Sequence, residues 1–296
     1  MIFSHLQYKA KPFLKWAGGK TQLLPVIEGL LPSSFAHHSS VTYVEPFVGG
    51  GAVMFYLLQK YPNITRAVIN DINPHLIHTY QAIKHYPEEL ILKLTQIQSM
   101  YSKLNGVDAQ KGYFLKIRER FNNGRRSLIE DAAYMIFLNR TCFNGLYREN
   151  SKGGFNVSFG KYVNPTILDE NLIRTDCEIL QKVDILQGDF SQIESYISDY
   201  TFIYFDPLTD RLVLQPPLLL TIRVTLMTEN NVVSRNSFQR WQVQVVTCYL
   251  VTRMELLLIL RIHIWTNSIR SLYYTEYLPR GQYPAPVINV AQFLSF

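Results

Sequence analysis

The chain has 296 residues, of which 47% are hydrophobic and 18% charged, with a formal net charge of +6. These values suit a soluble protein of one or two domains with a substantial core. No signal peptide is expected, because no stretch near the N-terminus combines a charged head, an apolar run and a small-residue cleavage site. No membrane span is expected either, because the apolar runs in the first two thirds of the chain are too short to cross a bilayer. The three cysteines are an odd number and lack metal-site spacing, so we expect them to be reduced thiols, as in a cytoplasmic protein. We expect no membrane partner.

The charge is unevenly distributed along the chain. Residues 111–162 hold ten Lys or Arg against four acids, whereas residues 163–206 hold two against nine. Aromatic residues are interspersed through the basic block. This pattern indicates contact with a polyanion, and a basic face exposed to solvent is an equal alternative.

The first elements read as strand, glycine turn, helix and strand. Residues 41–47 ("VTYVEPF") predict a buried strand, Gly49 to Gly51 a turn, and "AVMFYLLQK" a helix. Residues 66–71 ("RAVIND") predict a second strand ending in Asp71, with a helix after Pro74. This order is the beginning of a doubly wound parallel sheet, so the fold class is α/β.

A helical and basic insertion interrupts this sheet. Residues 87–140 carry helical periodicity, and residues 145–162 predict a hairpin around Ser151-Lys152-Gly153-Gly154. Two further strands, each ending in an acid, are expected within 182–190 and 200–206. We predict four parts. Residues 1–85 and 165–207 form the core, residues 86–164 form the insertion between them, and residues 208–296 form a tail.

The tail has a different composition. Between Pro207 and Phe296 there is no lysine, against thirteen in the first 206 residues, and Gly281 is its one glycine. Its apolar runs follow neither a helical nor a strand period, which predicts an irregular segment.

The glycine turn after the first strand suits a nucleotide ligand. Glycine lets the backbone approach the ligand, and the following helix offers free N–H groups. The dinucleotide fingerprint G-x-G-x-x-G fails, because Met54 stands at the third place. Asp71 could accept hydrogen bonds from a ribose diol, and an N-cap of the next helix is its structural alternative.

A second glycine pair lies at Gly18-Gly19-Lys20-Thr21 and is similar to the end of a phosphate-binding loop. The first glycine of that motif would fall at Leu14, and no strand clearly precedes it. Lys20 could instead meet a small carboxylate.

Together these segments resemble one family in order and spacing. They are "FLKWAGGK" (13–20), "VEPFVGGG" (44–51), "NDIN" (70–73), "FLNRTCFNGLYRENSKGGFNVSFGKY" (137–162), "GDF" (188–190) and "FDP" (205–207). They resemble the Dam-type DNA adenine-N6 methyltransferases over roughly residues 10 to 207. The resemblance implies a Rossmann-like core that uses S-adenosylmethionine, with an inserted helical and hairpin subdomain that recognises duplex DNA.

The resemblance also implies site residues. Asp206 and Pro207 would be catalytic, and the cofactor would be held by Trp16, Lys20, Glu45, Phe47, Gly49, Gly51, Asp71, Asp189 and Asp206. Arg148 would read a guanine edge by donating twice to O6 and N7. Lys15 is a second base-reading position, Phe143 and Asn144 would fill the stack left by a flipped adenine, and Arg140 and Lys161 would contact phosphate.

The family's catalytic motif Asp-Pro-Pro-Tyr is broken here. The chain reads Asp206-Pro207-Leu208-Thr209, without the second proline and the tyrosine that stacks on the flipped base. Removing one cytidine from GAC CCC CCT TAC AGA CCG, which encodes Asp-Pro-Pro-Tyr-Arg-Pro, yields Asp-Pro-Leu-Thr-Asp-Arg, the sequence of residues 206–211. We therefore hypothesise that residues 208–296 are the product of a frameshift, and we expect a product that is marginally stable.

The sequence predicts a DNA adenine-N6 methyltransferase of a restriction–modification system, acting at a GATC-like site beside a cognate restriction endonuclease, and inactive if the broken motif is essential. A DNA-binding pseudoenzyme without catalysis is the main alternative. A P-loop or dinucleotide enzyme is a third.

Overall fold

The computed structural model describes residues 8–16, 19–31, 35–198, 200–206, 245–247, 257–265 and 268–277. The chain divides into two compact units, residues 1–206 and 207–296. Pro207, one of the predicted catalytic residues, and most of the segment 208–296 lie outside the described residues.

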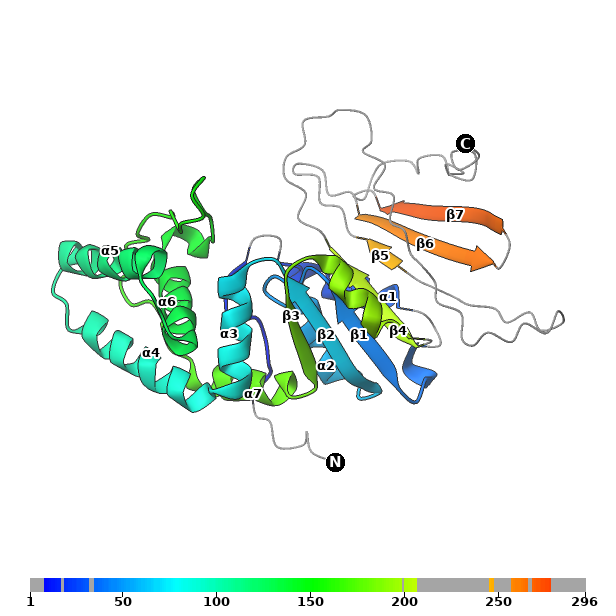
Figure 1. The fold of residues 1–296 in the computed structure, drawn as a ribbon, viewed down its shortest axis with the longest axis horizontal. Helices are drawn as coiled ribbons and strands as arrows, with labels where there is room; N and C mark the ends of the chain where they lie inside the picture. Colours follow the sequence, from blue (N-terminus) through cyan, green and yellow to red (C-terminus); the bar gives the residue numbers. More distant parts are fainter. Residues whose placement is uncertain are drawn as a thin grey trace. The chain divides into compact units, whose positions relative to one another are not determined.

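The first unit contains a parallel sheet whose strands follow the order β3-β2-β1-β4 (Figure 1). The strands are β1 (Val41–Glu45), β2 (Ile64–Asp71), β3 (Val183–Gln187) and β4 (Thr201–Phe205). Each predicted strand is present, with ends that differ by at most three residues. The strand order is that of a doubly wound sheet, in which β1 and β4 flank the point where the order reverses.

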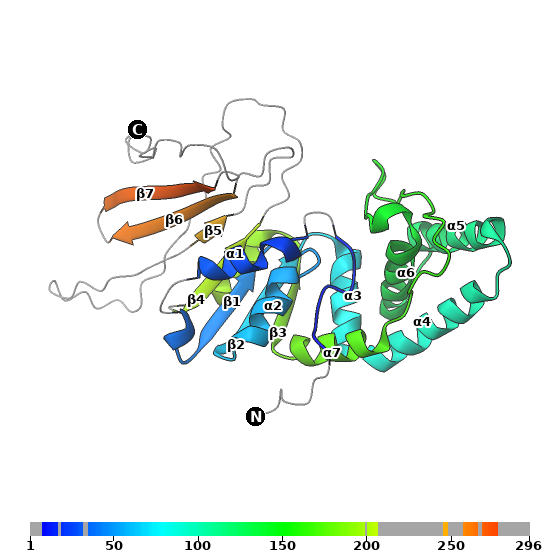
Figure 2. The same cartoon turned by 180° about the vertical axis from the view of Figure 1, so that it is seen from behind.

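Both faces of this sheet are covered, which is why its strands are nearly continuous apolar runs. Val44, Val68 and Ile193 form a buried cluster, so η5 (Phe190–Tyr196) covers one face. Helix α2 (Ala52–Lys60) lies on the other face, as the two opposite views show (Figures 1 and 2).

Side-chain caps set the beginnings of three helices. Asn73 accepts a hydrogen bond from the backbone N–H of Leu76 at 3.0 Å, and Pro74 begins α3 (Pro74–His85). Ser127 caps α6 (Leu128–Thr141) and Asp169 caps α7 (Glu170–Leu180) in the same way. The remaining short elements of this part are η2 (Thr21–Leu23), α1 (Leu24–Gly29) and η3 (Phe35–His37).

The insertion is helical, as predicted, and it is built around α6. Ten of the fourteen residues of α6 are buried, and this helix packs against α3, α4 (Pro87–Ser102) and α5 (Val107–Asn123). The three helices of the insertion lie beside α3, at the end of the sheet next to β3 (Figure 1). Helix α6 therefore joins the core to the insertion.

The predicted hairpin of residues 145–162 forms with less β-pairing than expected. Two isolated antiparallel bridges, Cys142 with Phe159 and Glu149 with Phe155, replace regular strands. The segment is rich in polar residues and glycines, so it has few apolar side chains that could pack one face of a strand. Gly153 turns the chain with a φ of 77°. Buried Phe155 anchors the loop against the ring of Phe121.

The second unit contains three described strands, although its sequence predicts an irregular segment. They are β5 (Val245–Thr247), β6 (Leu257–Trp265) and β7 (Ser268–Tyr277), and β6 pairs antiparallel with β7. The β-branched and aromatic residues of β6 and β7 favour extended backbone even without a regular period.

Candidate active site at the carboxyl edge of the sheet

Three carboxylates follow the carboxyl ends of adjacent strands. Glu45 is the last residue of β1, Asp71 is the last of β2, and Asp206 comes directly after β4. Because parallel strands end at one edge of the sheet, the fold brings these side chains to the same edge. This edge also holds the switch point between β1 and β4, where open α/β sheets bind their ligands.

Lys20 is paired with Asp206 across this edge. The Lys20 Nζ lies 2.8 Å from the Asp206 Oδ2, and the two side chains are only 9% and 16% exposed. Burial raises the pKa of Asp206, and the ammonium of Lys20 opposes that rise. Lys20 therefore limits the rise in the pKa of Asp206 that burial causes.

Glu45 is the most deeply buried of the three acids. Its Oε2 accepts a hydrogen bond from the Tyr43 hydroxyl at 2.7 Å. Burial raises the pKa of Glu45 to about 8, against the effect of the Tyr43 hydrogen bond and with a further contribution from the charges of Asp206 and Asp71. Glu45 therefore favours its neutral form near pH 7, and an incoming cationic group would favour its ionised form.

Asp71 is held by backbone N–H groups. The backbone N–H of Gly49 donates to its Oδ2 at 3.1 Å, and that of Asn73 donates to its Oδ1 at 3.0 Å. Burial raises the pKa of Asp71, and these hydrogen bonds work against it. The carboxylate thus links the glycine turn after β1 to the beginning of α3, and it does not act as the N-cap, which is Asn73.

The glycine turn is shaped by the indole ring of Trp16. Gly49 has a φ of 49°, and a Cβ placed there would lie 2.8 Å from the Trp16 Cδ1. On the other side Trp16 stacks on Tyr147, with ring centroids 5.1 Å apart. At Gly51, where φ is 71°, a Cβ would lie 2.5 Å from the Tyr80 hydroxyl oxygen. Only glycine fits both positions, so the turn approaches its surroundings more closely than any side chain would allow.

Phe47 and Asp189 lie in the two neighbouring loops. The rings of Phe47 and Phe190 are 5.6 Å apart, which joins the loop after β1 to the loop after β3. Asp189 is exposed, and its carboxylate accepts a hydrogen bond from the Ser191 backbone N–H at 2.9 Å. Its role as a cofactor contact stays a prediction.

Two of the predicted base-reading residues are positioned by asparagines. The Asn139 side chain accepts from the Lys15 backbone N–H and donates to the Lys15 carbonyl, both at 2.9 Å. The Arg148 Nε donates to the Asn156 Oδ1 at 2.8 Å, and the side chain of Arg148 stays exposed. Lys15 therefore reaches solvent from a fixed backbone, whereas the side chain of Arg148 is itself held by a hydrogen bond.

The predicted wedge residues form an exposed turn, η4 (Phe143–Gly145). The Phe143 side chain is 55% exposed, and Asn144 holds a left-handed φ of 57° while its backbone N–H donates to the Tyr162 hydroxyl. A large apolar ring held outward on a constrained turn is costly in water, which is consistent with insertion into a stack of bases.

The two predicted phosphate contacts differ. Lys161 is exposed with a φ of 54°. Arg140 is half-buried, and its Nη2 donates to the Phe13 carbonyl at 2.8 Å. Burial lowers the pKa of its guanidinium. This geometry favours a structural role for Arg140, and its contact with DNA stays a prediction.

Sequence reasoning missed several residues that support this site. They are Asn70, Tyr147, Asn139 and Asn156, and the first of them donates from its side chain to the Pro46 and Gly188 carbonyls. All four lie within or next to the recognised motifs, but no pattern shows which neighbours of a motif residue hold it in place.

The residues present fit an adenosyl sulfonium cofactor. The glycine turn offers close backbone approach, Asp71 suits ribose hydroxyls, and the buried acids suit a positive centre. A parallel α/β sheet with this strand order has the architecture of a Rossmann-like methyltransferase. Residues 16–207 match the family described as D12 class N6 adenine-specific DNA methyltransferase, and the chain belongs to this family.

Curated relatives support the assignment. The chain is 44% identical over 201 residues to the Type II methyltransferase M.MjaIII of Methanocaldococcus jannaschii, covering 67% of this chain and 69% of that one. It is 42% identical to the Type II methyltransferase M1.LlaDCHI of Lactococcus lactis, covering 67% and 65%. It is 33% identical to a DNA adenine methylase of Vibrio cholerae, again covering 67% and 65%.

These matches therefore extend over about two thirds of this chain and of each relative. The Dam-type resemblance and the α/β methyltransferase fold are confirmed. A P-loop or dinucleotide enzyme, the third alternative, has no support from the family match.

None of the helices in the described ranges is long and apolar enough to cross a bilayer.

Proposed function

We propose that this chain is built to bind S-adenosylmethionine at the carboxyl edge of its sheet and to transfer the methyl group to N6 of adenine in duplex DNA. The observation that carries the proposal is the meeting of the buried Lys20–Asp206 pair with Glu45 and Asp71 at the switch point. Family membership supplies the class of reaction.

Trp16, Lys20, Glu45, Asp71 and the turn from Gly49 to Gly51 would hold the cofactor, with Phe47 and Asp189 beside it. When bound, S-adenosylmethionine supplies an electrophilic methyl group on a sulfonium centre. Lys20 now donates to Asp206. A ligand carboxylate would compete for that ammonium and leave Asp206 available to other donors.

Asp206 would then act on the adenine amino group. The N6 lone pair is drawn into the ring, so the amino group is a poor nucleophile. A carboxylate that accepts an amino hydrogen returns electron density to N6 and stabilises the transition state. The proton of N6 leaves after transfer, with Asp206 as its nearest acceptor in the proposal.

The helical insertion would bind the DNA. Arg148 and Lys15 would read base edges, the turn of Phe143 and Asn144 would fill the gap left by the extruded adenine, and Lys161 would meet phosphate. Extrusion costs a few kcal/mol, which inserted side chains help to offset. We place the protein in the cytoplasm in a restriction–modification system, with a GATC-like site and a cognate restriction endonuclease as partner.

The broken motif favours a second candidate function for the chain as it stands. Leu208 and Thr209 occupy the places of the family's second proline and stacking tyrosine. A chain that retains Arg148 and Lys15 without this stacking ring would bind DNA and not methylate it.

Two assays on the full chain separate these functions. Transfer of a labelled methyl group from S-adenosylmethionine to duplex DNA, with N6-methyladenine identified after digestion, supports the enzyme. A gel shift with the same duplex and no transfer supports the second function. Failure to bind both S-adenosylmethionine and DNA would refute both.

A further inference from the structure

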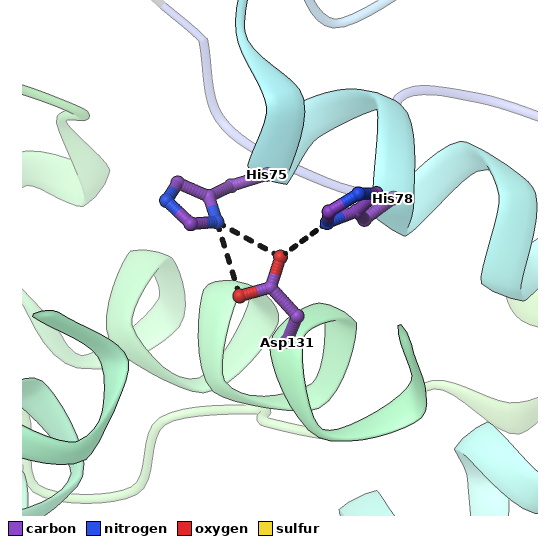
Figure 3. Close-up of side chains that lie close together, drawn as sticks. All are labelled: His75, His78 and Asp131. Atoms are coloured by element: carbon purple, nitrogen blue, oxygen red, sulfur yellow. Dashed lines mark hydrogen bonds and ion pairs between the residues drawn. The ribbon is translucent and has the colours of Figure 1, made fainter. Parts of the chain in front are cut away.

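Two histidines and an aspartate meet where α3 packs against α6. His75 and His78 lie three residues apart on one face of α3 (Figure 3). Both rings point with Nδ1 toward Asp131 of α6, at 2.8 Å and 2.7 Å from its Oδ2. Neither the family's chemistry nor the proposed site uses these three residues.

The donor set is one that metal ions favour. Two imidazole nitrogens and a carboxylate oxygen are common ligands of zinc and of other divalent first-row transition metals. The three ligand atoms all lie within 4.8 Å of one another. In a tetrahedral site with ligands about 2.0–2.2 Å from the ion, the ligand atoms are roughly 3.4 Å apart. The rings therefore need only small rotations to admit an ion.

The carboxylate of Asp131 is already oriented for this role. Its side chain is 5% exposed, and the Arg126 Nε donates to its Oδ1 at 2.7 Å. That hydrogen bond leaves Oδ2 directed at the two histidines, in the manner of the outer partners that fix metal ligands. The positive charge of Arg126 beside the ion weakens binding, so we expect an affinity below that of closed structural zinc sites.

Solvent reaches the cluster from the histidine side. The side chains of His75 and His78 are 21% and 38% exposed. An ion can therefore enter without unfolding the helices, and water can complete its coordination.

We propose that His75, His78 and Asp131 form a binding site for a divalent transition-metal ion, such as Zn²⁺, that joins α3 of the core to α6 of the insertion. Each imidazole would bind the ion through an unprotonated Nδ1 and carry its ring proton on Nε2, so the hydrogen bonds from Nδ1 to Asp131 give way to bonds to the ion. It links the helix that follows Asp71 to the helix that carries Asn139, which holds Lys15.

The test is a titration of the full chain with Co²⁺, whose visible absorption reports tetrahedral coordination, followed by competition with Zn²⁺. We expect saturable 1:1 binding with a Kd in the micromolar range or below. His75→Ala and His78→Ala should each weaken binding at least about tenfold, since each removes one of three protein ligands.

His85→Ala is the matched control, because His85 is an exposed histidine in the last turn of the same helix and outside the cluster. It should leave Co²⁺ binding unchanged. Circular dichroism without metal checks that each variant folds, and His75→Gln serves where the alanine variant does not. No saturable binding by the folded chain, or equal weakening by His85→Ala, would overturn the proposal.

Discussion

The first 206 residues and the last ninety differ in composition as two unrelated proteins would. The first region holds all thirteen lysines and all but one of the fifteen glycines, and it carries the recognised motifs of the family as far as Asp206. The family match ends at residue 207, one residue before the catalytic motif departs from its pattern. Strand β4 and the acid that follows it, Asp206, are thus present. The proline and the stacking tyrosine expected after Pro207 are replaced by Leu208 and Thr209.

This contrast teaches that cofactor binding, DNA binding and catalysis need not be lost together. Lys20, Glu45, Asp71 and Asp206 are all in the first region, as are the proposed DNA contacts. We expect the first region to account for binding, and the residues after Pro207 to account for any loss of catalysis.

The largest effect is expected from restoring the reading frame. Inserting one cytidine at the codons for residues 206–208 should return Asp-Pro-Pro-Tyr and raise methyl transfer by about 10³-fold or more, since it restores the groups that position the flipped base. A methylation assay comparing both products measures the gain. Sequencing the gene checks the premise, and a neighbouring frame without Asp-Pro-Pro-Tyr would contradict it.

The second prediction concerns the buried acid of the first region. The pKa of Glu45 is raised to about 8, so the unfolded chain releases this proton at lower pH than the native one. The free energy of unfolding should therefore fall as the pH rises from about 4.5 to about 8. Glu45→Gln should remove this fall and stabilise the protein at pH 8 by roughly 4 kcal/mol.

Denaturant unfolding at pH 5 and pH 8 measures this difference. Glu89→Gln, in the exposed first turn of α4, is the control and should change the stability by less than about 1 kcal/mol at either pH, the size of its interaction with the helix N-terminus. Equal stability of wild type and Glu45→Gln at pH 8 would show that Glu45 is not held in its neutral form.

A third prediction tests cofactor binding by the first region. Asp71→Asn should weaken S-adenosylmethionine binding by about 30-fold, because the amide replaces one hydrogen-bond acceptor by a donor facing the ribose. Calorimetric titration of the full chain gives the affinity. Asp184→Asn is the matched control, since Asp184 lies on β3 in an exposed pair with Arg66. An unchanged affinity for Asp71→Asn would remove Asp71 from the site.

The smallest expected effect concerns DNA. Arg148→Ala should lower affinity for a duplex containing GATC by about tenfold and affinity for a scrambled duplex much less, as expected for a base contact. Gel shifts at fixed salt measure both affinities. Arg174→Ala, on α7 and paired with Glu88 and Glu170, should leave both unchanged. Equal losses on both duplexes would assign Arg148 to phosphate.

Motif order and strand patterns predicted much of this protein. Buried apolar runs located the four parallel strands, and those ending in Asp71 and Asp206 placed two of the acids at the carboxyl edge of the sheet. The roles of Phe143, Asn144 and Arg148, which the resemblance implies, stay predictions. The three strands described beyond residue 206 did not follow from any pattern, and the origin of that segment stays a hypothesis.

Contacts between distant residues could be decided only by the folded chain. The Lys20–Asp206 pair, the neutral state favoured for Glu45 and the meeting of His75, His78 and Asp131 each depend on burial and on distances between separate elements. A linear motif records which side chains are present. Their protonation and their partners are set by the packing that removes water and brings charges within a few ångströms.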